Sequence, residues 1–224
     1  MSDNASSAEQ RARNFRQRVQ LVKVLRSGIR QHGQTIGKAA LTLSLVLNCA
    51  AGARAAQSLK VDSGSSEITF ALTDTLHAVK GNFGIASGEV SFDPQTGAMS
   101  GLLTVNATSG HSDSPARDHR MIDDELKAAV FPAITFTPQQ FTGSFHAQGQ
   151  STLQVTGAFT LLGKTHTITV PMNVTADNGK LTATGTFPIP YVAWGLKDPS
   201  VLFLRVGKVV TIDLKIDGTL TEGT

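Results

Sequence analysis

The sequence predicts an all-β protein, an antiparallel up-and-down barrel of about eight strands with one inserted α-helix near residues 115–130. From Lys60 onward, stretch after stretch alternates apolar and polar residues, which is typical of strands with one face on a core and one in water. Short turn motifs separate these stretches, so neighbouring strands are expected to be antiparallel. A single charged stretch from Ser114 to Phe136 interrupts the alternation.

Residues 1–56 are predicted to be a targeting segment, and residues 57–224 the barrel domain. Eight basic residues between Arg11 and Lys38 precede an apolar run of nine residues at 39–47, and Ala53 and Ala55 supply the small residues of a cleavage site. The apolar run is shorter than the roughly 20 residues that a membrane-spanning helix needs. We therefore expect a periplasmic or secreted protein, cleaved near Ala55-Ala56, with no stable membrane span after cleavage.

The predicted mature domain is mildly acidic, although the whole chain has a formal net charge of +3. Residues 57–224 hold eleven Lys and Arg against fifteen Asp and Glu. There is no basic stripe interleaved with aromatic residues, so no nucleic-acid partner is expected. The only cysteine, Cys49, lies within the predicted signal, and a mature chain without cysteine is compatible with an oxidising compartment.

The predicted strands share one periodicity. In chain order, the residues expected on the inward face are Ile68, Phe70 and Leu72; Leu153, Val155, Gly157, Phe159 and Leu161; Ile168, Val170, Met172 and Val174; Leu181, Ala183, Gly185 and Phe187; and Val210, Ile212, Leu214 and Ile216. A shift of one residue would expose each set, so the alternation specifies the register of the strands.

Turn chemistry lies where hairpins need it, at Asp93–Gly97, Leu162–Thr165 and Asp177–Gly179. Eight to ten strands suit either a sandwich or a closed barrel. Consecutive hairpins without long crossover connections favour the barrel.

The interrupting stretch predicts an amphipathic helix of about 13 residues laid against the barrel. Ser114 is the expected N-cap, Pro115 fits the first helical position, and Asp118 lies near the positive end of the helix. Phe131-Pro132 is expected to end the helix, because the residue before proline avoids the α region. One apolar stripe is expected from Ile122, Leu126, Ala129 and Val130.

A set of motifs then identifies a family. In chain order they are Ser66–Phe70, His77–Phe83, Gly88–Asp93, Arg117-Asp118 followed by Phe131–Phe136, and Val155–Ile168. Their order and spacing make residues 58–219 resemble the YceI-like family, lipocalin-like barrels that bind polyisoprenoid or similar lipids. The less typical stretch Phe187–Gly195, which holds the only Trp and the only Tyr, is expected near a cavity mouth.

Pattern alone leaves open whether the barrel interior is filled or hollow. Small inward residues such as Gly81, Gly157 and Gly185, alternating with large ones, predict gaps that join into an apolar tunnel. The resemblance implies a hollow barrel that holds a polyisoprenoid or quinone-like lipid, with no other cofactor. The expected ligand contacts are Phe70, Leu72, His77, Val79, Phe83, Phe92, Phe136, Val155, Phe159, Ile168, Val170, Phe187 and Trp194.

Arg117 and Asp118 are assigned either to a ligand headgroup or, as we prefer, to anchoring the helix on the barrel. A buried arginine needs a partner, which Asp118 or another carboxylate would supply. Trp194 and Tyr191 lie among prolines, and their loop is expected to plug one end of the barrel, with a gate as the alternative.

Catalytic and metal sites are not expected. No two histidines have the i, i+4 spacing of a zinc helix and no cysteine accompanies them. Nor does a strand lead into a nucleophile elbow, a phosphate loop or a dinucleotide fingerprint.

The sequence therefore predicts a non-enzymatic carrier of an apolar lipid. The alternatives are a stress-related structural or interaction module with a filled barrel and, third, a hydrolase-like or metal-dependent enzyme. That third hypothesis would use His111, Asp113, Asp118 and His119. The resemblance also implies a homodimer.

Overall fold

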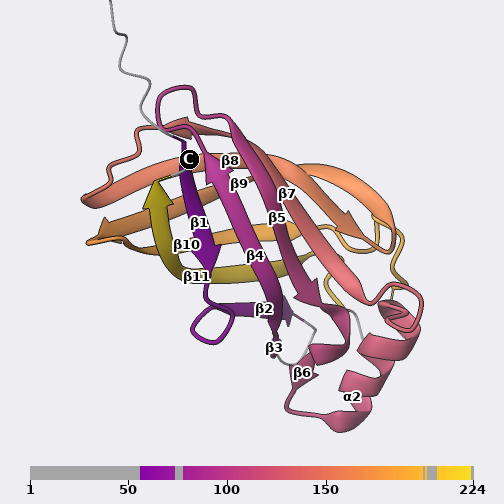
Figure 1. Ribbon diagram of the computed structural model, residues 1–224. Coiled ribbons are helices and arrows are strands. Elements are labelled where there is room, and N and C mark those ends of the chain that lie inside the picture. The colour runs from indigo at the N-terminus through magenta and orange to yellow at the C-terminus, as the bar shows by residue number, and fades with distance from the viewer. Residues whose placement is uncertain (1–55, 74–77, 199, 201–205, 223–224) are drawn as a thin grey trace, which may run out of the picture. The chain divides into compact units, whose positions relative to one another are not determined.

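The computed structural model describes residues 56–73, 78–198, 200 and 206–222 and shows an all-β antiparallel barrel with one short helix (Figure 1). The predicted targeting segment up to Ala55 lies outside the described residues. The strands are β1 (Gln57–Val61), β2 (Glu67–Thr73), β3 (Ala78–Phe83), β4 (Ile85–Phe92), β5 (Met99–Asn106), β6 (His111–Ser112), β7 (Ala133–Gly143), β8 (Gly149–Leu161), β9 (Lys164–Asp177), β10 (Lys180–Ile189) and β11 (Val210–Glu222).

The sheet closes on itself. Its order runs β1-β4-β5-β7-β8-β9-β10-β11, and β11 pairs back onto β1 with Leu59 opposite Leu220. The first half of β11 pairs with β2 instead, with Leu214 opposite Ile68. β1 and β2 pair with different halves of the same side of β11, so together they occupy one position in the barrel. β4 pairs with β1 and β3 pairs with β2, so β3 and β4 together occupy the next position. The barrel therefore has eight strand positions in up-and-down order, as the sequence predicts.

Two of the hairpins turn within two residues. Asn178 and Gly179 have φ values of 48° and 74°, and Leu162 and Gly163 have φ values of 51° and 69°. Positive φ at both central positions is the type I′ turn, whose twist matches that of the flanking strands. These turns explain why β8, β9 and β10 are consecutive neighbours.

The inserted helix is confirmed at its beginning. Helix α2 (Pro115–His119) starts with Pro115 at its first position, although the Ser114 side chain makes no capping hydrogen bond. It continues as a π-helical turn, Arg120–Glu125, where the Leu126 N–H donates to the Met121 carbonyl at 2.9 Å. Figure 1 shows α2 beside β6.

The helix ends earlier than predicted. Lys127 adopts φ 49°, a left-handed conformation that typically terminates a helix, so the chain turns there and not at Phe131-Pro132. The predicted apolar stripe is therefore wrong at its far end: Ala129 is exposed, and Val130 is 70% exposed. Leu126 is buried as predicted, and Ala128 is buried in place of Ala129.

One end of the barrel is closed by aromatic packing. Phe92 lies edge-on to Phe145, with ring centroids 4.9 Å apart, and to Phe141 at 6.1 Å. This cluster lies where β4, β5 and β7 approach the end away from the helix.

Within the described residues, no helix is long and apolar enough to span a bilayer.

Candidate ligand cavity

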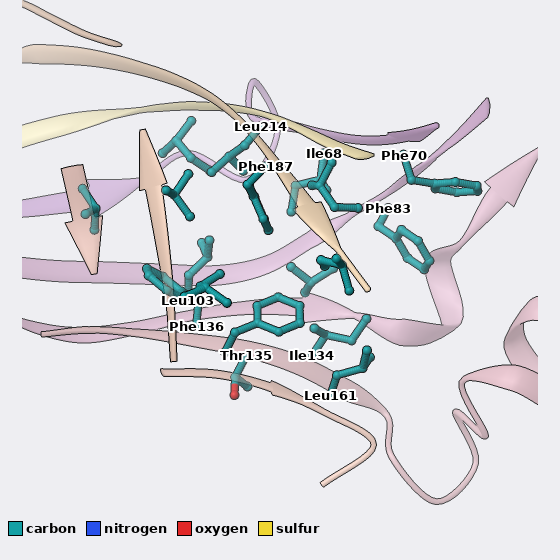
Figure 2. A pocket seen from close by; sticks show the side chains of 18 of the residues that line it. Ile68, Phe70, Phe83, Leu103, Ile134, Thr135, Phe136, Leu161, Phe187 and Leu214 are labelled. Carbon is teal, nitrogen blue, oxygen red and sulfur yellow. The ribbon is translucent and has the colours of Figure 1, made fainter. Parts of the chain in front are cut away.

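The barrel encloses an apolar cavity of about 450 Å³. Side chains from every strand except β6 line it, because alternate residues of each strand point to the same face. Figure 2 shows Phe70 and Phe83 on one side, and Leu103 and Phe136 on another, around a common space. A volume of this size falls within the range of small-molecule sites.

On β9 and β11 the inward residues become more exposed toward the helix end. On β11, Ile216 is buried whereas Leu214 and Ile212 are only half-buried. On β9, Val170 is buried and Ile168 is half-buried. Since these residues line the cavity, their remaining exposure is to it. On β8 and β10, Leu161 and Ile189 at the same end are buried, so the opening is along β9 and β11.

Eleven of the thirteen predicted contact residues line the cavity: Phe70, Leu72, Val79, Phe83, Phe92, Phe136, Val155, Phe159, Ile168, Val170 and Phe187. His77 lies outside the described residues. Trp194 is not on the cavity wall. The structure adds Leu103, Ile134 and Leu214 to the wall; the alternation of the last strand had already marked Leu214 as inward.

Trp194 packs against the inward face of β8 and β9 without lining the cavity itself. Its ring stacks on His166 with centroids 4.1 Å apart and planes 6° apart, and lies 5.7 Å from Phe159, which does line the cavity. The same loop is tied down by Tyr191, whose hydroxyl donates to the Gly207 carbonyl at 2.7 Å. Burial raises the pKa of Tyr191. His166 is opposite Phe159 in the β8–β9 ladder, so both side chains are on the inward face. Trp194 packs against both of them at the helix end of the barrel, the position expected of a plug.

The inward glycines do not form the predicted gaps. A Cβ on Gly157 would lie 2.6 Å from the Phe136 ring, and one on Gly185 would lie 2.5 Å from the Met172 sulfur. At Gly81 the corresponding space is taken by the ring of Phe70. Side chains of neighbouring strands therefore cover the backbone at these glycines, and the glycines themselves add no space to the cavity.

Charged residues line the cavity at the helix end. Arg117, Arg120 and Glu125 come from the helical segment, and Lys197 comes from the loop after β10. The Lys197 backbone N–H donates to the Glu125 carboxylate at 3.0 Å, which joins the two elements. Arg120 and Lys197 are exposed, so this end of the cavity is a mouth that reaches solvent.

Asp118 anchors the helix to β6. Its carboxylate accepts the Ser112 N–H at 2.8 Å and the Ser112 hydroxyl at 2.6 Å, and it contacts His111 Nδ1 at 3.0 Å. These interactions, led by the Ser112 hydroxyl, lower the pKa of Asp118. Arg117 takes a different partner, forming an ion pair with Asp113.

The four residues of the enzyme hypothesis do not converge. His111 pairs with Asp118, Asp113 pairs with Arg117, and His119 pairs with Asp123. Within the described part of the chain, no group of three His, Cys, Asp or Glu residues could hold a metal ion. Of the four residues, only His111 and Asp118 contact each other; Asp113 and His119 are each held by a different partner.

We expect Asp118→Asn to lower the melting temperature at pH 7 and to lose this effect in acid. A carboxyl with a depressed folded-state pKa stabilises the fold above its unfolded-state pKa of about 3.9, and the stabilisation is lost as the pH falls through the folded-state value. Thermal unfolding between pH 7 and pH 3 measures the gap between wild type and variant. Asp123→Asn, at an exposed ion pair, is the matched control. A gap that does not narrow as the pH falls below about 3.9 would contradict the assignment.

The fold and the cavity together define a class: closed antiparallel barrels that enclose an apolar internal site. Within this class, the YceI-like domain profile matches residues 59–218, and the chain belongs to that family. No match is found among curated proteins.

Solved structures show the same fold. Burkholderia cenocepacia BcnA is 25% identical with a TM-score of 0.59, and the match covers 71% of this chain and 99% of BcnA. A polyisoprenoid binding domain from Saccharophagus degradans, described as implicated in plant cell wall breakdown, is 14% identical with a TM-score of 0.59, covering 73% of this chain and 98% of that one. A Campylobacter jejuni YCEI protein variant is 19% identical with a TM-score of 0.53, covering 65% and 86%.

Proposed function

We propose that this protein is a lipid-binding protein that holds one isoprenoid-like or other long apolar molecule inside the barrel and performs no catalysis. The observation that carries the proposal is the apolar cavity, whose charged lining residues lie at its mouth. The polyisoprenoid binding described for the Saccharophagus degradans domain supports the choice of ligand class.

Energetics favours a long tail. Burial contributes about 0.8 kcal/mol per methylene group, while association costs roughly 4–15 kcal/mol. A chain on the order of ten or more methylenes is therefore needed before binding becomes favourable. Polyisoprenoid and quinone-like lipids both meet this requirement.

The place of action is proposed to be the periplasm or the cell exterior. The basic region, the apolar run at 39–47 and the small residues Ala53 and Ala55 support export. Mass spectrometry of the protein expressed from its first residue tests this, with cleavage expected near Ala55-Ala56.

Native mass spectrometry after mild purification from the host tests the binding function. We expect one lipid-sized mass excess per barrel, and the same spectrum reports whether the expected homodimer forms. The protein, stripped of lipid and offered a polyprenol and an isoprenoid quinone, should bind at least one of them. An empty barrel that takes up neither would overturn the proposal and favour the filled structural module.

A further inference from the structure

The cavity has an apolar body and a cationic mouth. Three basic side chains line the helix end: Arg117, Arg120 and Lys197. The remaining lining is almost wholly hydrophobic, and among the described residues the only other charged one in it is Glu125. This positive mouth contrasts with the net negative charge of residues 57–224.

Two of the three cations are directed to the mouth without an ion pair in the described part of the chain. Arg117 is already paired with Asp113, and Glu125 accepts the backbone N–H of Lys197 while leaving that residue's ammonium unassigned. Arg120 and Lys197 are exposed and have no salt bridge to any described residue. They stand on two elements that the Glu125 hydrogen bond holds together.

We propose that this mouth selects amphiphiles with an anionic head, a carboxylate or a phosphate, contacted by Arg120 and Lys197. The inference rests on the proposed lipid-binding function and adds the chemistry of the head. A tail buried in the apolar body leaves its head at the mouth, beside the two cations. The Arg guanidinium binds either anion through two parallel hydrogen bonds, and the Lys ammonium adds a point charge.

Arg117 and Asp118 have separate roles in the structure. Asp118 is held by Ser112 and His111 and anchors the helix. Arg117 lines the mouth but is neutralised by Asp113. The head-binding role therefore falls to Arg120, three residues beyond Arg117, and to Lys197, neither of which the sequence singles out.

The test compares probes that share one tail and differ in the head. Farnesyl phosphate is compared with farnesol, and palmitate with palmitamide, each by calorimetry below its aggregation concentration and at low salt. Two exposed charge contacts predict tighter binding of the anionic probe by about 2- to 30-fold. The two pairs show separately whether phosphate or carboxylate is preferred, and 0.5 M salt should reduce the preference.

In the double variant Arg120→Gln/Lys197→Gln, the affinity for the anionic probe should fall to that for the neutral probe. The affinity for the neutral probe should not change. The matched control is Lys180→Gln, at an exposed lysine that begins β10 at the other end of the barrel; it should change the affinity for neither probe. Equal affinities for charged and neutral heads in wild type would overturn the inference while the lipid-binding function stands. A preference that survives in the double variant would overturn the assignment to these two residues, and failure of all four probes to bind would count against the lipid-binding function itself.

Discussion

Replacement of Val155 by Trp should weaken binding of an apolar tail by about tenfold or more. Val155 is half-buried on β8 and lines the cavity, opposite Phe141 on β7 and Val170 on β9. An indole there occupies space that the tail needs. Displacing only two methylenes costs about 1.6 kcal/mol, which corresponds to more than tenfold in the dissociation constant.

The matched control is the preceding residue. Gln154 is exposed on the outer face of the same strand, so Gln154→Trp adds the same ring outside the barrel and should leave the affinity unchanged. Thermal unfolding of both variants separates loss of binding from loss of fold. If Val155→Trp binds a polyprenol or a fatty acid as tightly as wild type, the barrel interior does not hold the tail.

The strand pattern predicts the barrel because each strand buries one face. Ile68, Phe70 and Leu72 on β2, and Leu214 and Ile216 on β11, lie inward as their parity requires. Prediction is harder at β-bulges, which change parity within one strand. On β7 the register shifts between Pro138 and Gln140, so Phe136 and Phe141, five residues apart, both face the interior.

The helix illustrates a different limit. Its first turn could be predicted from Pro115 and Asp118, because those signals are local. Its end is set by the left-handed conformation of Lys127, which no periodicity of apolar residues reveals. The partner of Arg117 could not be predicted either, because two carboxylates, Asp113 and Asp118, lie within a few residues of it. In the structure Asp118 is hydrogen-bonded to Ser112 of β6, and Arg117 pairs with Asp113.

The site was predictable in its apolar part and not at its mouth. Inward parity identifies most of the wall, but Trp194 lies in a loop and has no strand parity, and it stacks on His166 at the end of the barrel without lining the cavity. The mouth cations come from a helical turn and a loop that are far apart in sequence and meet through one hydrogen bond. The inward glycines are interpreted from sequence as empty space, whereas side chains from neighbouring strands cover them.

Because the Phe136 ring covers Gly157, Gly157→Ala should destabilise the fold by about 1–3 kcal/mol. A Cβ on Gly157 would lie 2.5 Å from the Thr137 carbonyl oxygen and 2.6 Å from the Phe136 ring. The carbonyl belongs to the adjacent strand and cannot move alone, so both the ladder and the ring must shift. For a domain of this size, the melting temperature should fall by roughly 2–12 °C.

Gly64→Ala is the control, because the nearest atom to its added Cβ is the Asp62 carboxylate oxygen at 3.5 Å, and its stability should stay within about 0.5 kcal/mol of wild type. The double variant Gly157→Ala/Phe136→Leu separates the two clashes: removing the ring should restore part of the stability, and the part not restored measures the strain against Thr137. A Gly157→Ala protein that melts with wild type would mean that the Phe136 ring is not fixed on the bare backbone. The ring would then be free to fill the cavity, and the glycine would have no part in keeping the barrel hollow.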